Sequence, residues 1–117
     1  MNIQIFGRAK CFDTRSAERY FKERQIKFQF IDIDDKGISP GELQSVINAI
    51  KDLNLLIDKK SKLYDSLHIA FVRRTDDDIK ELLLENPKLF VTPIVRNGKL
   101  ATLGLQKDIW NNWISNS

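Results

Sequence analysis

The stretch FVTPIVRNGKLATLG, residues 90–104, carries the clearest structural signal in this chain. Its Asn97-Gly98 pair stands between two apolar runs, and in that setting the pair strongly indicates a β-hairpin. Pro93 interrupts the first run, and a proline there marks the start of a strand or a cis peptide bond. The stretch therefore predicts two antiparallel strands that follow a proline turn.

Upstream of this hairpin, the pattern predicts a parallel pair of strands joined by a helix. Residues 2–6 and 27–33 alternate polar and apolar side chains, which is typical of strands. Residues 12–24 repeat apolar side chains at helical spacing. One helix between two strands indicates a β-α-β unit with parallel pairing and a right-handed crossover. We expect residues 34–38 to form a polar turn.

Helices are predicted for most of the segment between the second strand and the hairpin. The sequence Ser39-Pro-Gly-Glu42 is typical of a helix start, with Ser39 as N-cap, and this helix should reach about Lys51. Residues 52–74 read as short helical pieces, and Thr75 caps a further helix. After the hairpin, residues 106–114 should close the chain as a helix. We expect residues 1–117 to form one α/β domain. Its predicted order of elements is β-α-β-α followed by β-β-α, with a helical insertion at about 40–88.

Composition and charge exclude several classes of function. The net charge of +3 comes from 19 basic and 16 acidic side chains that are interspersed, so no nucleic-acid partner is expected. No apolar run approaches the roughly 18 residues of a membrane span, and residues 1–6 do not resemble a signal peptide. A single cysteine fits a reducing compartment, so we expect a cytoplasmic protein. We also expect it to be a monomer. With one histidine, His68, and one cysteine, no metal site is expected.

Cys11 is the candidate nucleophile. It lies between the first strand and the first helix, where unpaired backbone N–H groups and the helix dipole stabilise a thiolate. Arg8, Lys10 and Arg15 add positive charge around it, and the Thr14 hydroxyl is one helical turn away. These features indicate an accessible thiol of low pKa. The alternative is that Cys11 is a small, inert core residue, as many free cysteines are.

The strand–cysteine–helix start, the SPGEL helix start at 39–43 and the stretch NPKLFVTPIVRNGKLATLG at 86–104 together resemble the arsenate reductase-like (ArsC/Spx/YffB-type) family. That family contains glutaredoxin-coupled arsenate reductases and Spx-type transcriptional regulators. The resemblance implies a thioredoxin-like fold with a mixed four-stranded sheet and a cis peptide bond at Pro93.

The resemblance also assigns roles to residues of this chain. The nucleophile of the reductases matches Cys11, and the hydroxyl and basic residues that follow it match Thr14 and Arg15. A histidine of the reductases is replaced here by Gly7, and their three oxyanion-binding arginines are replaced by Asp58, Thr92 and Leu105. Because guanidinium groups bind such anions best, true arsenate reduction is not expected. Whether other arginines replace them stays open, and the candidates are Arg8, Arg73, Arg74 and Arg96.

What remains is a monothiol pattern, Cys-Phe-Asp-Thr at 11–14. A single thiol forms a mixed disulfide that an external thiol must resolve, so we expect a thiol-dependent oxidoreductase with no bound cofactor and with glutathione or glutaredoxin as partner. The predicted substrate-binding residues are Arg8, Lys10, Thr92, Pro93 and Arg96. The alternative is an Spx-like, non-enzymatic regulator or protein-binding module with RNA polymerase as its partner.

Overall fold

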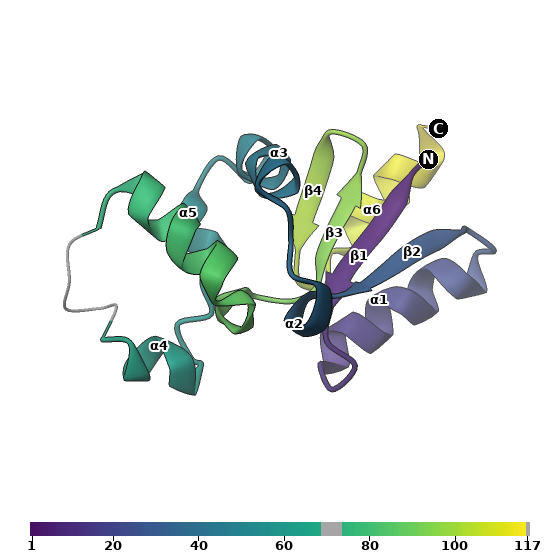
Figure 1. The fold of residues 1–117 in the computed structure, drawn as a ribbon. Coiled ribbons are helices and arrows are strands. Elements are labelled where there is room, and N and C mark those ends of the chain that lie inside the picture. The colour runs from purple at the N-terminus through teal and green to yellow at the C-terminus, as the bar shows by residue number, and fades with distance from the viewer. Residues whose placement is uncertain (69–73, 117) are drawn as a thin grey trace.

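A four-stranded mixed sheet forms the centre of the computed structural model, which describes residues 1–68 and 74–116 (Figure 1). The strand order is β2-β1-β3-β4. Strand β1 (Ile3–Gly7) pairs in parallel with β2 (Phe28–Asp32) and antiparallel with β3 (Ile94–Asn97). Strand β4 (Leu100–Leu103) pairs antiparallel with β3. The predicted α/β class and mixed sheet are confirmed, and the topology is thioredoxin-like.

Helices α1 (Phe12–Glu23) and α6 (Lys107–Ser115) cover one face of the sheet (Figure 1). The apolar stripe of α1 is buried against alternate residues of β1 and against Trp110 of α6. The Trp110 ring is fully buried, and its Nε1–H donates to Oγ1 of Thr102 over 2.8 Å. This face therefore contains one buried polar pair within an aromatic core.

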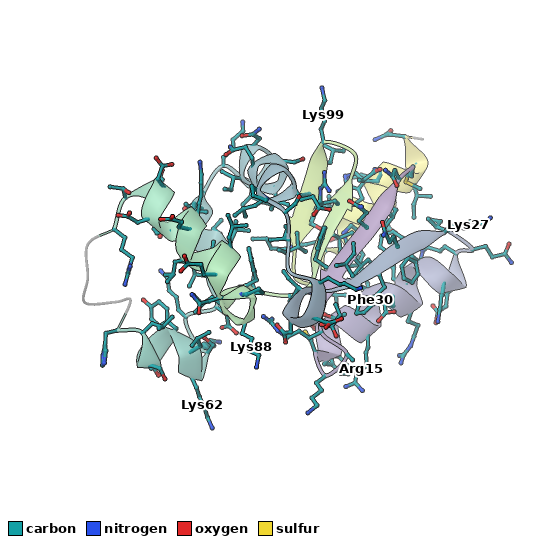
Figure 2. The ribbon with its side chains drawn as sticks, viewed as in Figure 1. Arg15, Lys27, Phe30, Lys62, Lys88 and Lys99 are labelled. Carbon is teal, nitrogen blue, oxygen red and sulfur yellow. The ribbon has the colours of Figure 1, made fainter. Side chains whose placement is uncertain are left out.

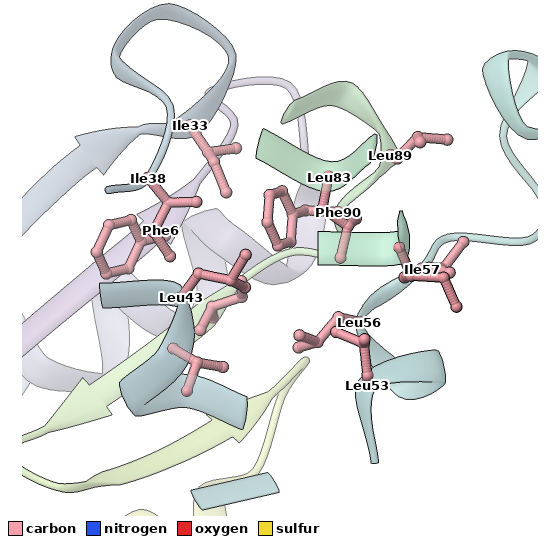
Figure 3. Packing of buried hydrophobic residues seen from close by; sticks show 13 residues of the cluster. Phe6, Ile33, Ile38, Leu43, Leu53, Leu56, Ile57, Leu83, Leu89 and Phe90 are labelled. Atoms are coloured by element: carbon pink, nitrogen blue, oxygen red, sulfur yellow. The ribbon is translucent and has the colours of Figure 1, made fainter. Parts of the chain in front are cut away.

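The other face carries the segment between β2 and β3. Its elements are α2 (Ile33–Lys36), α3 (Pro40–Ile50), the 3-10 turn η1 (Leu53–Leu56), α4 (Lys62–Ser66), α5 (Asp76–Glu85) and the 3-10 turn η3 (Pro87–Leu89). Phe6 of β1 packs in one apolar cluster with Ile33, Leu43, Leu83 and Phe90 (Figure 3). This cluster joins the helical segment to the sheet.

Two predicted helix starts are confirmed and one predicted turn is wrong. Ser39 and Thr75 both form capping boxes, with Glu42 and Asp78 respectively. Residues 33–36 form the helix α2, where a polar turn was predicted, because the Asp32 side chain accepts from the N–H of Asp34 and Ile33 is buried. The short helical pieces predicted for 52–74 correspond to η1 and α4 as far as residue 68, and residues 69–73 lie outside the described residues.

The predicted hairpin is present, with Gly98 and Lys99 as its two-residue loop. Gly98 has φ of +60°, a backbone conformation that glycine adopts without steric cost. The first strand begins only after Pro93, and the Thr92–Pro93 peptide bond is cis, as the resemblance implies. Among the described residues, no helix is both long and apolar enough to cross a membrane.

Replacing Thr102 with valine tests the buried polar pair. The substitution keeps the shape but leaves the Trp110 N–H without an acceptor, so we expect it to lower the free energy of unfolding by about 1–3 kcal/mol. Chemical denaturation measures the change. The free energy of unfolding of Thr102→Ser, which retains the hydroxyl, should be closer to that of the wild type. Equal stability of the valine variant and the wild type would contradict this account.

Candidate active site

Cys11 is the N-cap of α1 and lies just beyond the end of β1. Its N–H donates to the carbonyl of Arg8 over 3.0 Å, which closes the loop that precedes the helix. The side chain is half-buried, and Sγ donates to the carbonyl oxygen of Thr92, 3.7 Å away. Cys11 therefore meets the residue before the cis Pro93, as the similar family implies.

The surroundings of the thiol favour its ionised form. Burial raises the pKa of Cys11, but hydrogen bonding by the hydroxyls of Thr14 and Thr92 and by the backbone N–H groups of Thr14 and Asp13 lowers it by more. The net result is a thiol whose pKa lies below its ordinary value. The sequence predicted the Thr14 hydroxyl beside the sulfur. It did not predict that the Thr92 hydroxyl has the same role.

The Thr14 side chain occupies the space that a side chain at Gly7 would need. A Cβ atom at residue 7 would lie 2.3 Å from Cγ2 and 2.6 Å from Oγ1 of Thr14, whose side chain is fully buried. The reductases that the sequence resembles carry a histidine here. In this chain a side chain at residue 7 would displace the hydroxyl that stabilises the thiolate.

Arg8 reaches the site, but its guanidinium group binds the protein itself. Nε donates to both carboxylate oxygens of Asp34 over 2.9 Å. The two terminal nitrogens donate to the carbonyls of Phe90 and Pro87 and to Oγ1 of Thr92. Arg8 was predicted to bind substrate, whereas the structure shows a side chain that holds three segments of the chain together.

Lys10 and Arg15 lie at the surface beside Cys11. Arg15 follows one helical turn after the cysteine, and its side chain points outward from the start of α1 (Figure 2). Phe12, directly after Cys11, has 71% of its surface exposed. Sequence reasoning did not single out this aromatic ring, although an aromatic residue at the first position of a helix was a visible signal. Two exposed cations and one exposed aromatic ring thus lie within four residues of Cys11 in the chain.

Arg96 is not brought to Cys11. It lies on β3 opposite Gln4, near the start of β1, whereas Cys11 follows the end of that strand. Its guanidinium donates to Oε1 of Gln4 over 2.6 Å and to Oγ of Ser45 over 3.2 Å, and it lies 3.8 Å from the Glu42 carboxylate. The predicted role of Arg96 in binding substrate at the thiol has no support in this arrangement.

Of the two remaining candidate arginines, only Arg74 belongs to the part of the chain that the structure describes, and it does not lie near Cys11. Arg74 directly precedes the N-cap of α5, and that end of α5 lies across the molecule from the start of α1 (Figure 1). Arg73 lies outside the described residues. Thr92 occupies the position beside the cis proline where the similar reductases have an arginine, and its hydroxyl serves the thiol instead.

Two further features bear on cofactors and metals. A hollow of about 710 Å³ lies over β1 and β2, lined by Gln4, Gln29, Ile31 and Glu42 among others, and Cys11 is not part of its lining. Within residues 1–68 and 74–116, no three His, Cys, Asp or Glu side chains lie close enough together to bind a metal ion.

Comparison with known proteins places this arrangement in context. The model of the ArsC family matches residues 6–112. The chain is 27% identical to the global transcriptional regulator Spx 2 of Oceanobacillus iheyensis over an alignment of 109 residues. This alignment covers 92% of this chain and 80% of that protein. An ArsC family related protein from Bacteroides fragilis has a TM-score of 0.87 at 19% identity, covering 96% of this chain and 97% of that one. An arsenate reductase from Vibrio cholerae superimposes with a TM-score of 0.81 at 24% identity. The superposition covers 88% of this chain and 89% of the reductase.

Replacing Gly7 with alanine tests the contact with Thr14. Because the added methyl group overlaps a short, fully buried side chain, we expect the free energy of unfolding to fall by about 1–3 kcal/mol. We also expect the pKa of Cys11 to rise, measured by the pH dependence of its alkylation. Gly41→Ala is the matched control, since nothing lies within 4 Å of a Cβ at that position. If both variants behave alike, the close contact does not set the position of the hydroxyl.

Proposed function

This chain belongs to the ArsC family, and on that premise we propose that it is a monothiol oxidoreductase in which Cys11 exchanges with disulfides. The observation that carries the proposal is the lowered pKa of a half-buried thiol at the start of a helix, beside a cis proline. A thiolate is the form of cysteine that attacks sulfur. An inert core cysteine would be buried in apolar surroundings, and its pKa would be raised.

The proposed reaction has two exchange steps. The Cys11 thiolate attacks one sulfur of a disulfide such as oxidised glutathione, the S–S bond breaks, and the departing thiolate takes up a proton. A second thiol, as its thiolate, then attacks the sulfur joined to Cys11 and releases the Cys11 thiolate. The chain has no second cysteine, so this second thiol comes from outside, as free glutathione or a glutaredoxin.

The surface around Cys11 suits a small anionic thiol compound. Lys10 and Arg15 are exposed cations close to Cys11 in the chain, and glutathione carries two carboxylates. The Thr92 backbone, next to the cis Pro93, offers polar groups to a bound peptide. An oxyanion such as arsenate calls for several convergent guanidinium forks, and Arg8 is occupied by Asp34 and two carbonyls.

A second candidate is a regulatory or protein-binding role. It is favoured by the similarity, over 92% of this chain, to a protein named a global transcriptional regulator. In such a role Cys11 would be a structural residue, and RNA polymerase is the partner we would test. Thr92 and Thr14 stand where the similar regulators have an arginine and a second cysteine, which weighs against this candidate.

The central prediction concerns glutathione. After treatment with oxidised glutathione, mass spectrometry should show one glutathione attached to Cys11, and added reduced glutathione should remove it. Cys11→Ser should abolish the adduct, whereas Arg19→Met, which removes an exposed cation on the same helix, should leave it unchanged. An unmodified wild-type thiol that is alkylated no faster than a free cysteine would overturn the proposal and leave the regulatory candidate.

The arsenate reaction gives a second, separate prediction. Because Asp58, Thr92 and Leu105 replace the oxyanion-binding arginines of similar reductases, we expect at most feeble arsenate turnover with glutathione and glutaredoxin. A coupled assay of NADPH consumption measures it. Robust turnover would show that other groups bind the oxyanion.

A further inference from the structure

The two hydroxyl groups beside Cys11 share one hydrogen-bond donor residue, Arg8. The backbone N–H of Arg8 donates to Oγ1 of Thr14, and a terminal guanidinium nitrogen donates to Oγ1 of Thr92, both over 3.3 Å. A threonine hydroxyl has one proton to donate and two lone pairs that accept. Each oxygen can therefore accept from Arg8 and still donate its proton to the sulfur, and hydrogen bonding by both hydroxyls lowers the pKa of Cys11.

The direction of the guanidinium group is set by partners other than Thr92. The Asp34 carboxylate accepts from Nε over 2.9 Å, and the carbonyls of Phe90 and Pro87 accept from the terminal nitrogens over 2.8 and 2.9 Å. The side chains of Arg8 and Asp34 are only 20% and 29% exposed. A guanidinium is planar and its five N–H groups have fixed directions, so three partners determine where the remaining N–H groups point.

The apolar core holds these partners in place. Ile33, next to Asp34, and Phe90 are both fully buried in the cluster between the sheet and the helical segment (Figure 3). The Asp32 cap and the α2 turn fix Asp34 relative to Ile33. The positions of the carboxylate and of the Phe90 carbonyl are therefore consequences of core packing.

We propose that Arg8 is a positioning residue for the Cys11 nucleophile: its side chain orients the Thr92 hydroxyl toward the sulfur, and Asp34 holds that side chain in place. The inference rests on the proposed function only in taking Cys11 as the nucleophile, and it holds for whichever disulfide the thiol attacks. The Arg8 side chain acts through Thr92, whereas its backbone N–H acts on Thr14. Replacing the side chain therefore tests the Thr92 half alone.

The test is a charge-neutral double variant, Arg8→Met with Asp34→Asn. It removes one positive and one negative charge, so the net charge near the thiol is unchanged while the oriented donor is lost. We expect the thiolate fraction of Cys11 at neutral pH to fall about three- to tenfold, the effect of losing one oriented hydrogen bond to a thiolate. The ultraviolet absorbance of the thiolate and the alkylation rate, both followed against pH, measure it. Arg19→Met is the control and should match the wild type.

Two further variants test whether the effect comes from the orientation of the Thr92 hydroxyl rather than from the charge of Arg8 or from a loss of folding. Arg8→Lys keeps the charge, but one ammonium group cannot bind Asp34, two carbonyls and Thr92 together, so its thiolate fraction should also fall. In a Thr92→Val background, the double variant should have little additional effect, because the hydroxyl it orients is absent. Circular dichroism verifies folding, and Arg8→Lys carries the test if the double variant does not fold.

The possible outcomes distinguish this inference from the proposed function. A wild-type thiol that titrates like free cysteine overturns the proposed function. A reactive wild-type thiol together with a wild-type titration for Arg8→Lys and the double variant leaves the function standing and overturns the role of Arg8. An equal effect of the double variant with and without the Thr92 hydroxyl also overturns it.

Discussion

The hydrogen bonds of the Arg8 guanidinium group join three segments that are distant in the chain: the loop before α1, the helix α2 and the turn that leads to Pro93. Apolar packing brings these segments together, but hydrophobic contact has no direction and cannot aim a hydroxyl. The planar guanidinium supplies that direction. The guanidinium donates to the Thr92 hydroxyl, and Cys11 Sγ donates to the Thr92 carbonyl, so the proposed orientation of that hydroxyl depends on one side chain that is held by several partners.

The positive charges near Cys11 fall into two kinds. Arg8 is paired with Asp34 and surrounded by carbonyls, so it offers little charge to a ligand. Lys10 and Arg15 are exposed, so water and salt screen their charges, but a small anion in solution can reach them. Such a site stabilises a thiolate by hydrogen bonding and attracts a small anion weakly. It has no set of convergent, unoccupied guanidinium groups around the sulfur within the part of the chain that the structure describes.

Local signals were sufficient to predict the strands, the hairpin and the capped helices, because a capping box at Ser39 or a glycine turn at Gly98 acts over a few residues. The mixed four-stranded sheet was predicted from the resemblance to the family. The sequence analysis did not predict the helix α2, because four residues are too few to show a helical periodicity and its only local sequence signal is the N-cap Asp32. The position of the Thr14 hydroxyl beside the Cys11 sulfur could be predicted from their spacing. The partners of Arg8 could not, because they lie 26 to 84 residues away and depend on core packing.

In the proposed exchange reaction, the absence of a second cysteine makes the stabilised thiolate important in both steps. In the first step Cys11 attacks, and a lowered pKa increases the fraction that can attack while reducing the nucleophilicity of each thiolate by a smaller factor. In the second step Cys11 is the leaving group, and a thiol of lower pKa leaves faster. A protein with two cysteines speeds this release with an intramolecular attack. In the reaction proposed for this chain the release would depend on an external thiol, so the hydroxyls of Thr14 and Thr92 that stabilise the departing thiolate would contribute directly to the regeneration of Cys11.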